Sequence, residues 1–84
     1  MKLIFAEQAW EDCRYWQTTD PRMVRRIHEL IKDCLRNPFS GIGKPEPLRH
    51  TLAGYWSRRI SEEHRMVYKI ESGALLLAQL RYHY

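Results

Sequence analysis

The second half of the chain contains three strand-like runs that are separated by two short breaks. The runs cover Gly54 to Ser61, Arg65 to Glu71 and Leu75 to Tyr84, and the breaks are Glu62-Glu63-His64 and Ser72-Gly73. This spacing is typical of consecutive antiparallel hairpins, in which each strand pairs with the one before it. The sequence therefore predicts a meander that needs a cover over one of its faces.

Two helices are predicted ahead of the meander and supply that cover. After a short apolar strand at Lys2 to Ala6, helical spacing begins at Glu7 and continues to about Thr19. The apolar positions of this helix are Ala6, Trp10, Cys13 and Trp16. Asp20-Pro21 predicts the start of a second helix, because Asp caps free amides and Pro needs no N–H partner at the first position. Asn37-Pro38 predicts its end.

The expected fold class is therefore α+β: one strand, two helices and four further strands, with both helices packed on one face of an antiparallel sheet. A chain of 84 residues can hold one modest core, so residues 1–84 are expected to form a single domain. Phe39 to Pro47 is rich in Pro and Gly and reads as a loop, and Leu48 to Leu52 could form a short strand beyond it.

Alternation along the last two strands predicts a core face and an open face. The core face would contain Met66, Tyr68, Ile70, Leu76, Ala78 and Leu80. The open face would contain Arg65, Val67, Lys69, Gln79, Arg81 and His83. In the strand before them, Arg58 shares its parity with Trp56 and Ile60, so the same rule buries Arg58 unless a bulge intervenes.

The charge of the chain bears on the kind of partner it binds, and its apolar stretches bear on its location in the cell. A formal net charge of +4 favours a phosphate-bearing or acidic partner. No stretch approaches the roughly 20 apolar residues that span a bilayer, and the amino terminus reaches acidic residues too soon for a signal peptide, so we expect a cytoplasmic protein.

Cys13 and Cys34 lie on apolar helix faces and are expected to be buried thiols. His50, His64 and His83 lack metal-ligand spacing, so neither a metal nor a cofactor is expected.

Glu46, Arg65 and His83 together could cleave RNA. RNA supplies its own nucleophile, the 2′-OH, so a protein need only remove that proton, stabilise the negative charge of the transition state and protonate the departing 5′ oxygen. The arginine fork suits the second task because it donates two hydrogen bonds to phosphate oxygens. Taken alone, these residue types also fit a solvated loop carboxylate, a surface ion pair and an exposed strand end.

Four blocks spread along the chain carry a more specific pattern. They are Lys44-Pro45-Glu46-Pro47-Leu48-Arg49-His50, Gly54-Tyr55-Trp56-Ser57-Arg58-Arg59-Ile60, Glu62-Glu63-His64-Arg65-Met66-Val67-Tyr68 and Arg81-Tyr82-His83-Tyr84. In register, they closely resemble the YoeB (Txe/YoeB) toxins of the RelE superfamily of toxin-antitoxin mRNA endoribonucleases. The likeness runs through the whole chain and implies a RelE-like fold, similar to that of small microbial ribonucleases.

The resemblance also implies a function and partners. Such a protein is a bacterial toxin that enters the ribosomal A site and cleaves mRNA there without a metal ion. A cognate acidic antitoxin, similar to YefM, holds it inactive, and operator DNA is contacted only through the antitoxin complex. Relatives of this type can form homodimers. The alternative is a non-catalytic domain that blocks translation by occupying ribosomal RNA, or that serves only in an antitoxin complex acting on DNA.

Residue roles follow from the same resemblance. Glu46 would be the general base, Arg65 the stabiliser of transition-state charge, His83 the general acid and Tyr84 the residue that orients the scissile nucleotide. The expected RNA- and phosphate-binding residues are Lys44, Arg49, Tyr55 and Arg59. Arginine stands at position 49 where the family pattern has lysine, so a fork replaces a point donor there. The rings of Trp10, Trp16 and Trp56 are expected to pack in the core or between elements, and Tyr55, of opposite parity to Trp56, is the better candidate for stacking on a base.

Overall fold

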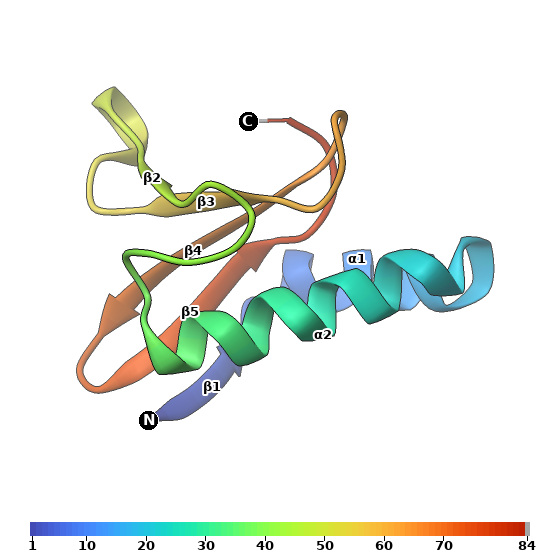
Figure 1. The fold of residues 1–84 in the computed structure, drawn as a ribbon, viewed down its shortest axis with the longest axis horizontal. Coiled ribbons are helices and arrows are strands. Elements are labelled where there is room, and N and C mark those ends of the chain that lie inside the picture. The colour runs from blue at the N-terminus through green and yellow to red at the C-terminus, as the bar shows by residue number, and fades with distance from the viewer. Residues whose placement is uncertain (84) are drawn as a thin grey trace.

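The computed structural model describes residues 1 to 83, and Tyr84 lies outside the described residues. The elements are β1 (Lys2–Phe5), α1 (Glu7–Thr19), α2 (Pro21–Arg36), β2 (Glu46–Pro47), the short 3-10 helix η1 (His50–Leu52), β3 (Trp56–Arg59), β4 (Arg65–Glu71) and β5 (Ala74–Gln79). This order confirms the expected α+β fold (Figure 1). The prediction of a short strand at Leu48 to Leu52 was wrong. Strand β2 lies before this segment, and residues 50–52 form the 3-10 helix η1 instead.

The described strands form one five-stranded sheet in the order β1-β5-β4-β3-β2. Strands β2 to β5 pair antiparallel, as the hairpin spacing predicts, but β1 pairs parallel with β5. The sheet is therefore mixed rather than wholly antiparallel. A parallel neighbour needs a long crossover, and the two helices and the meander together provide it.

The two helices begin and end where the sequence predicts. Asp20 caps α2 by accepting a hydrogen bond from the backbone N–H of Arg22, and Pro21 occupies the first turn. The helix ends at Arg36, and the N–H of the next residue, Asn37, still donates to the carbonyl of Asp33. Neither described helix is long and apolar enough to cross a membrane.

Helix α1 faces the sheet with a slightly different stripe from the one predicted. Ala9, Cys13 and Trp16 are buried, whereas Trp10 is 52% exposed. Trp10 therefore does not belong to the buried stripe, because spacing of three and four also fits a stripe that starts at Ala9, which turns Trp10 to the flank, where it packs between elements. There its ring meets the ring of Phe5 edge to face, with centroids 6.2 Å apart.

A bulge in β5 changes which of its residues enter the core. Tyr68 pairs with Leu77 but Val67 pairs with Gln79, so Ala78 is an extra residue on β5. Leu75 and Leu77 are fully buried, and the prediction that Leu76 and Ala78 fill the core was wrong. A bulge reverses the alternation beyond it. Leu80 therefore reaches the core as predicted, together with Met66 and Tyr68 of β4.

Arg58 is fully buried on the helix side of β3, as unbroken alternation requires. Its Nη1 lies 2.6 Å from Oδ2 of Asp33, and its Nε donates to the hydroxyl of Tyr68 at 3.2 Å. The remaining N–H groups of Arg58 donate to the carbonyl oxygens of Asn37, Ser40 and Ile42. A buried charge is tolerated when it is paired and hydrogen-bonded in this way.

The Arg58 network fixes the loop that leads into β2. The hydroxyl of Tyr68 donates to the carbonyl of Pro38, and burial raises the pKa of Tyr68 to about 12. Gly41, with a φ of +123°, packs so closely that any Cβ there would collide with the carboxylate of Asp33. The loop from 37 to 43 is therefore held against the sheet just before Glu46.

Candidate active site

Three neighbouring strands place polar side chains on the sheet face opposite Arg58 and the helices. Glu46 of β2 pairs with Ser57 of β3, and Arg59 of β3 pairs with Arg65 of β4. Residues that pair directly point to the same side of a sheet, so these four side chains share one surface. We call Glu46, Ser57, Arg59 and Arg65 the polar face.

The centre of the polar face is a contact between Arg65 and Glu46. Nη1 of Arg65 lies 3.1 Å from Oε1 of Glu46 and 3.4 Å from Oγ of Ser57. The side chain of Arg65 is only 11% exposed, whereas that of Glu46 is 52% exposed. The guanidinium is therefore held in place by its surroundings, while the carboxylate remains accessible to a substrate.

Ser57 belongs to this site, although no sequence pattern marked it as a site residue. It is fully buried between the strand of Glu46 and the strand of Arg65. Its odd-numbered position, two residues before Arg59, was the available signal, since alternation places both on the same face.

Arg59 and Arg65 are directly opposite each other on adjacent strands. Like charges in this position destabilise a sheet unless an anion lies between or above them. Arginine pairs are suited to phosphate, because each planar fork can donate two hydrogen bonds to its oxygens. Arg59 is exposed and can therefore meet a ligand from solvent. This register supports phosphate binding at the polar face.

The segment after β5 brings His83 next to the start of β4, where Arg65 lies. The strand stops at Gln79, so the prediction that it continues to Tyr84 was wrong. The backbone N–H of Arg65 instead donates to the carbonyl of Tyr82 at 3.0 Å, and His83 follows directly in the chain. His83 is exposed and borders a hollow with Gln79 and Tyr82. Figure 1 shows this end of the chain beside the turn between β3 and β4.

Arg81 does not join the open face, contrary to the alternation prediction. Its guanidinium lies over the ring of Tyr15 on α1, 3.5 Å from the ring centroid, and also over the ring of Tyr82. Once β5 ends, alternation no longer directs the side chains. Cation–π contacts with the two tyrosine rings then determine where Arg81 lies.

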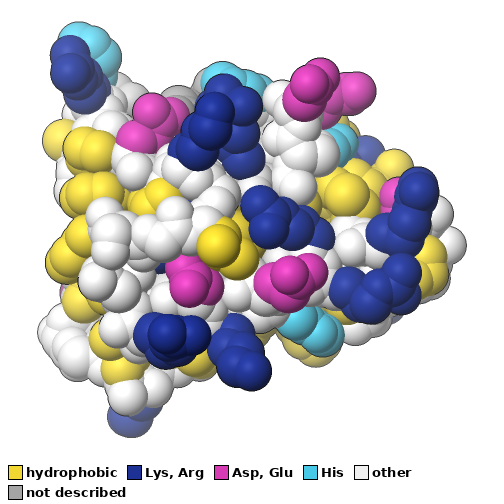
Figure 2. Space-filling model, viewed as in Figure 1, with side chains coloured by type: hydrophobic (Ala, Val, Ile, Leu, Met, Phe, Trp, Pro, Cys, Tyr) yellow, Lys and Arg dark blue, Asp and Glu magenta, His cyan; other side chains and the backbone are white. Residues whose placement is uncertain are grey.

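Three of the predicted RNA-binding residues, Lys44, Arg49 and Tyr55, are near neighbours of Glu46 or Ser57 in the sequence. Arg49 is exposed and lines a hollow together with Glu46. Lys44 is exposed two residues before Glu46, in a left-handed conformation with a φ of +52°. Tyr55 is half-buried, and Nζ of Lys69 lies 4.9 Å from its ring centroid. Figure 2 shows cationic side chains spread over the molecular face in view, including the tip formed by η1.

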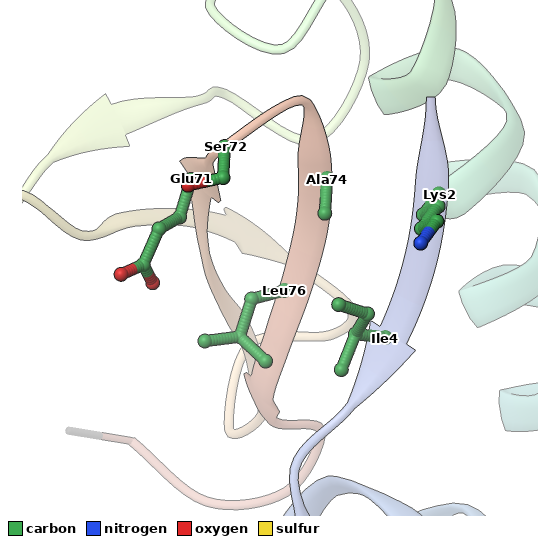
Figure 3. Close-up of a pocket in the computed structure, with 6 residues that line it drawn as sticks. All are labelled: Lys2, Ile4, Glu71, Ser72, Ala74 and Leu76. Carbon is green, nitrogen blue, oxygen red and sulfur yellow. The ribbon is translucent and has the colours of Figure 1, made fainter.

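Outside the polar face, residues 1–83 contain fewer side chains that are grouped for catalysis or metal binding. No group of three or more His, Cys, Asp or Glu side chains within residues 1–83 could hold a metal ion. A hollow between β1 and β5 is lined by Ile4, Ala74 and Leu76 with Lys2 and Glu71 at its rim (Figure 3). It lies at the edge of the sheet formed by β1, whereas β2 and Glu46 form the other edge.

Comparison with known proteins gives consistent matches over the chain. Residues 5–84 match the model of the YoeB-like toxin of bacterial type II toxin-antitoxin system. Toxin YoeB of Escherichia coli strain K12 is 61% identical over 84 residues, which cover all of both chains. A solved YoeB/ParE toxin from Agrobacterium tumefaciens is 52% identical, with a TM-score of 0.96 and complete coverage of both chains.

YoeB from Staphylococcus aureus has been solved both as a dimer and in a heterotetrameric YoeB-YefM toxin-antitoxin complex. The TM-scores are 0.92 for the dimer and 0.91 for the complex, at 46% identity in each case. Each comparison covers 100% of this chain and 98% of the solved chain.

Proposed function

The chain belongs to the family of YoeB-like toxins of bacterial type II toxin-antitoxin systems, and from this premise we propose that it is a ribosome-dependent mRNA endoribonuclease. The observation that carries the proposal is the contact between Glu46 and Arg65 on the polar face, with Arg59 opposite Arg65. This arrangement combines an accessible base with two phosphate-binding groups, which are the parts that cleavage through the 2′-OH requires.

The first half of the reaction uses Glu46 and Arg65. The half-exposed carboxylate of Glu46 takes the proton of the 2′-OH as the 2′ oxygen attacks phosphorus. Negative charge then grows on the phosphate oxygens, and Arg65 and Arg59 stabilise it by hydrogen bonding. Because the guanidinium of Arg65 is largely buried, little reorganisation is needed when that charge develops.

The second half uses His83 as the general acid. Its imidazolium gives a proton to the departing 5′ oxygen as the bond between phosphorus and that oxygen breaks. The new bond between the 2′ oxygen and phosphorus leaves a 2′,3′-cyclic phosphate on one fragment and a free 5′-hydroxyl on the other. Tyr84 orients the scissile nucleotide, and Lys44, Arg49 and Tyr55 hold the flanking RNA.

No metal ion or cofactor is required in this scheme. Glu46 and His83 perform the proton transfers, and Arg65 and Arg59 stabilise the charge, so cleavage should persist in EDTA. Chelation dismantles ribosomes by itself, and the assay therefore needs crosslinked or pre-bound ribosome complexes. Loss of cleavage on intact complexes, restored by a divalent ion, would contradict metal independence.

The partner that silences the toxin is proposed to be an acidic antitoxin similar to YefM. A YoeB relative has been solved in complex with YefM, and the net charge of +4 favours an acidic segment across the polar face. Contact with operator DNA would be made only through that complex. A homodimer is a second proposed assembly, supported by the solved YoeB dimer. An enzyme acting on translating ribosomes works in the cytoplasm.

The competing function is a non-catalytic domain that blocks translation by binding ribosomal RNA, or that acts only within an antitoxin complex on DNA. The same basic surface would serve either role. Primer extension on translating ribosomes separates an enzyme from a blocker. Discrete new mRNA ends after induction support the endoribonuclease, whereas stalled translation on intact message supports the blocker.

A further inference from the structure

His64 connects the turn between β3 and β4 to the segment that carries His83. Its Nδ1 accepts a hydrogen bond from the backbone N–H of Tyr82 at 2.8 Å. This contact requires the tautomer that carries its proton on Nε2, since only an unprotonated ring nitrogen accepts. The imidazole ring also meets the ring of Trp16 edge to face, with centroids 4.8 Å apart.

The backbone of Tyr82 is held from both sides by consecutive residues. Its N–H donates to the side chain of His64, and its carbonyl accepts from the N–H of Arg65 at 3.0 Å. Between these two bonds Tyr82 has a φ of +67°, a left-handed conformation that is unfavourable for a bulky residue. Such a conformation persists only where the surroundings hold it, and it commonly marks a functional site.

Helix α1 anchors the same segment two residues earlier. The N–H of Leu80 donates to the buried carboxylate of Asp12, and the carbonyl of Leu80 accepts from the indole of Trp16. Trp16 therefore contacts the segment at Leu80 and also packs against His64. Two anchored residues, Leu80 and Tyr82, leave the chain little freedom just before His83.

We propose that His64 is a positioning residue whose Nδ1 holds Tyr82 in its left-handed conformation and so fixes where His83 is presented beside Arg65. His64 does not touch the reacting atoms. The effect on cleavage rests on the proposed function, whereas the anchoring of Tyr82 stands without it. Misplacement of a reacting group by about 1 Å can lower a rate by about 100-fold, so this anchor has measurable consequences.

A matched pair of variants tests the acceptor role. In His64→Asn the amide oxygen can occupy the place of Nδ1, whereas in His64→Gln the longer side chain carries its amide toward the place of Nε2. Both variants lose the ring that packs against Trp16 and both are neutral. We expect His64→Gln to lower the single-turnover cleavage rate on ribosomes by about 10- to 100-fold. His64→Asn should recover most of that loss.

A second measurement tests the hydrogen bond between Tyr82 and His64 without relying on cleavage. Amide hydrogen exchange by NMR should show Tyr82 protected in the wild type and in His64→Asn, and faster exchange in His64→Gln. Equal cleavage rates and equal Tyr82 protection in the two variants would overturn the acceptor role of Nδ1. If the wild-type protein cleaves no message while Tyr82 exchange still distinguishes the variants, the proposed function fails and the anchor stands.

Discussion

Arg65 on β4 reaches across β3 to Glu46 on β2, and Nη1 of Arg65 lies 3.1 Å from Oε1 of Glu46. Strand β2 has only two residues, so its own pairing with β3 holds it weakly. The loop before it is fastened by the buried guanidinium of Arg58. The position of the proposed base thus depends on an arginine on the opposite face of the sheet.

Substitutions on the polar face should separate chemistry from binding. Glu46→Gln and His83→Gln should each lower the single-turnover cleavage rate by a factor on the order of 10² to 10⁴ with ribosome affinity near wild type. Arg65→Ala should cost at least as much, because it removes charge stabilisation that grows toward the transition state. Glu62→Gln, in the exposed β3–β4 turn, is the matched control. A His83→Gln protein that cleaves at the wild-type rate would remove the imidazole from the mechanism.

The ion pair between Asp33 and Arg58 should make stability depend on pH in acid. The hydrogen bond from Arg58, helped by the N–H of Ile42, lowers the pKa of Asp33 below its ordinary value. The unfolded chain therefore binds this proton more readily, so the stabilisation is present above about pH 4 and is lost as the pH falls through the folded pKa.

Asp33→Asn tests this linkage directly. The variant should unfold at lower urea concentration than the wild type at pH 7, and the difference between the two proteins should shrink as the pH falls toward 3. Urea titrations at several pH values measure it. A difference that stays constant over this range would show that the charge of Asp33 does not stabilise the fold.

Because of the bulge in β5, substitutions of the neighbouring residues Leu76 and Leu77 should lower the stability by different amounts. Leu77 is fully buried, so Leu77→Ala should lower the free energy of unfolding by about 2–5 kcal/mol. Leu76 is half-buried on the other side of the strand, and Leu76→Ala should cost clearly less. Denaturant unfolding of the two variants compares them within one strand. A larger loss in Leu76→Ala would contradict the bulge and restore the simple alternation.

Local sequence signals predicted the elements well because they act over a few residues. Asp20-Pro21 predicted the start of α2, and the break at Ser72-Gly73 predicted the hairpin between β4 and β5. Long-range features were missed, since β1 pairs with β5 across nearly the whole chain. The bulge at Ala78 was missed for the same reason, because only the partner strand reveals an extra residue.

The candidate site was predicted unevenly. Glu46 and Arg65 were proposed from the family pattern, and the register of β2, β3 and β4 brings them into contact. The burial of Arg58 could be predicted from alternation. Its hydrogen-bond partners Asp33 and Asn37 could not be predicted, since they come from α2 and a loop. The role of Tyr84 stays a prediction, because Tyr84 lies outside the described residues.

An acidic antitoxin should bind the polar face and suppress toxicity. With a net charge of +4, association should slow as salt is added, because screening weakens attraction between opposite charges. Expression of the chain alone should arrest growth, and co-expression of a YefM-like partner should restore it. If the wild-type chain accumulates alone without harm while mRNA stays intact, the toxin activity proposed here is contradicted.

The most direct test of the central claim is cleavage of a message that carries a single 2′-deoxy nucleotide at the mapped cleavage position. The ribosome complex is formed in advance, and single-turnover cleavage is compared with that of the all-ribose message. Because the 2′-OH is the proposed nucleophile, the substituted message should stay intact at that position, and the ribose message should yield a 2′,3′-cyclic phosphate and a 5′-hydroxyl. Cleavage of the 2′-deoxy message at the ribose rate, or products with 5′-phosphate ends, would contradict the mechanism assigned to Glu46, Arg65 and His83.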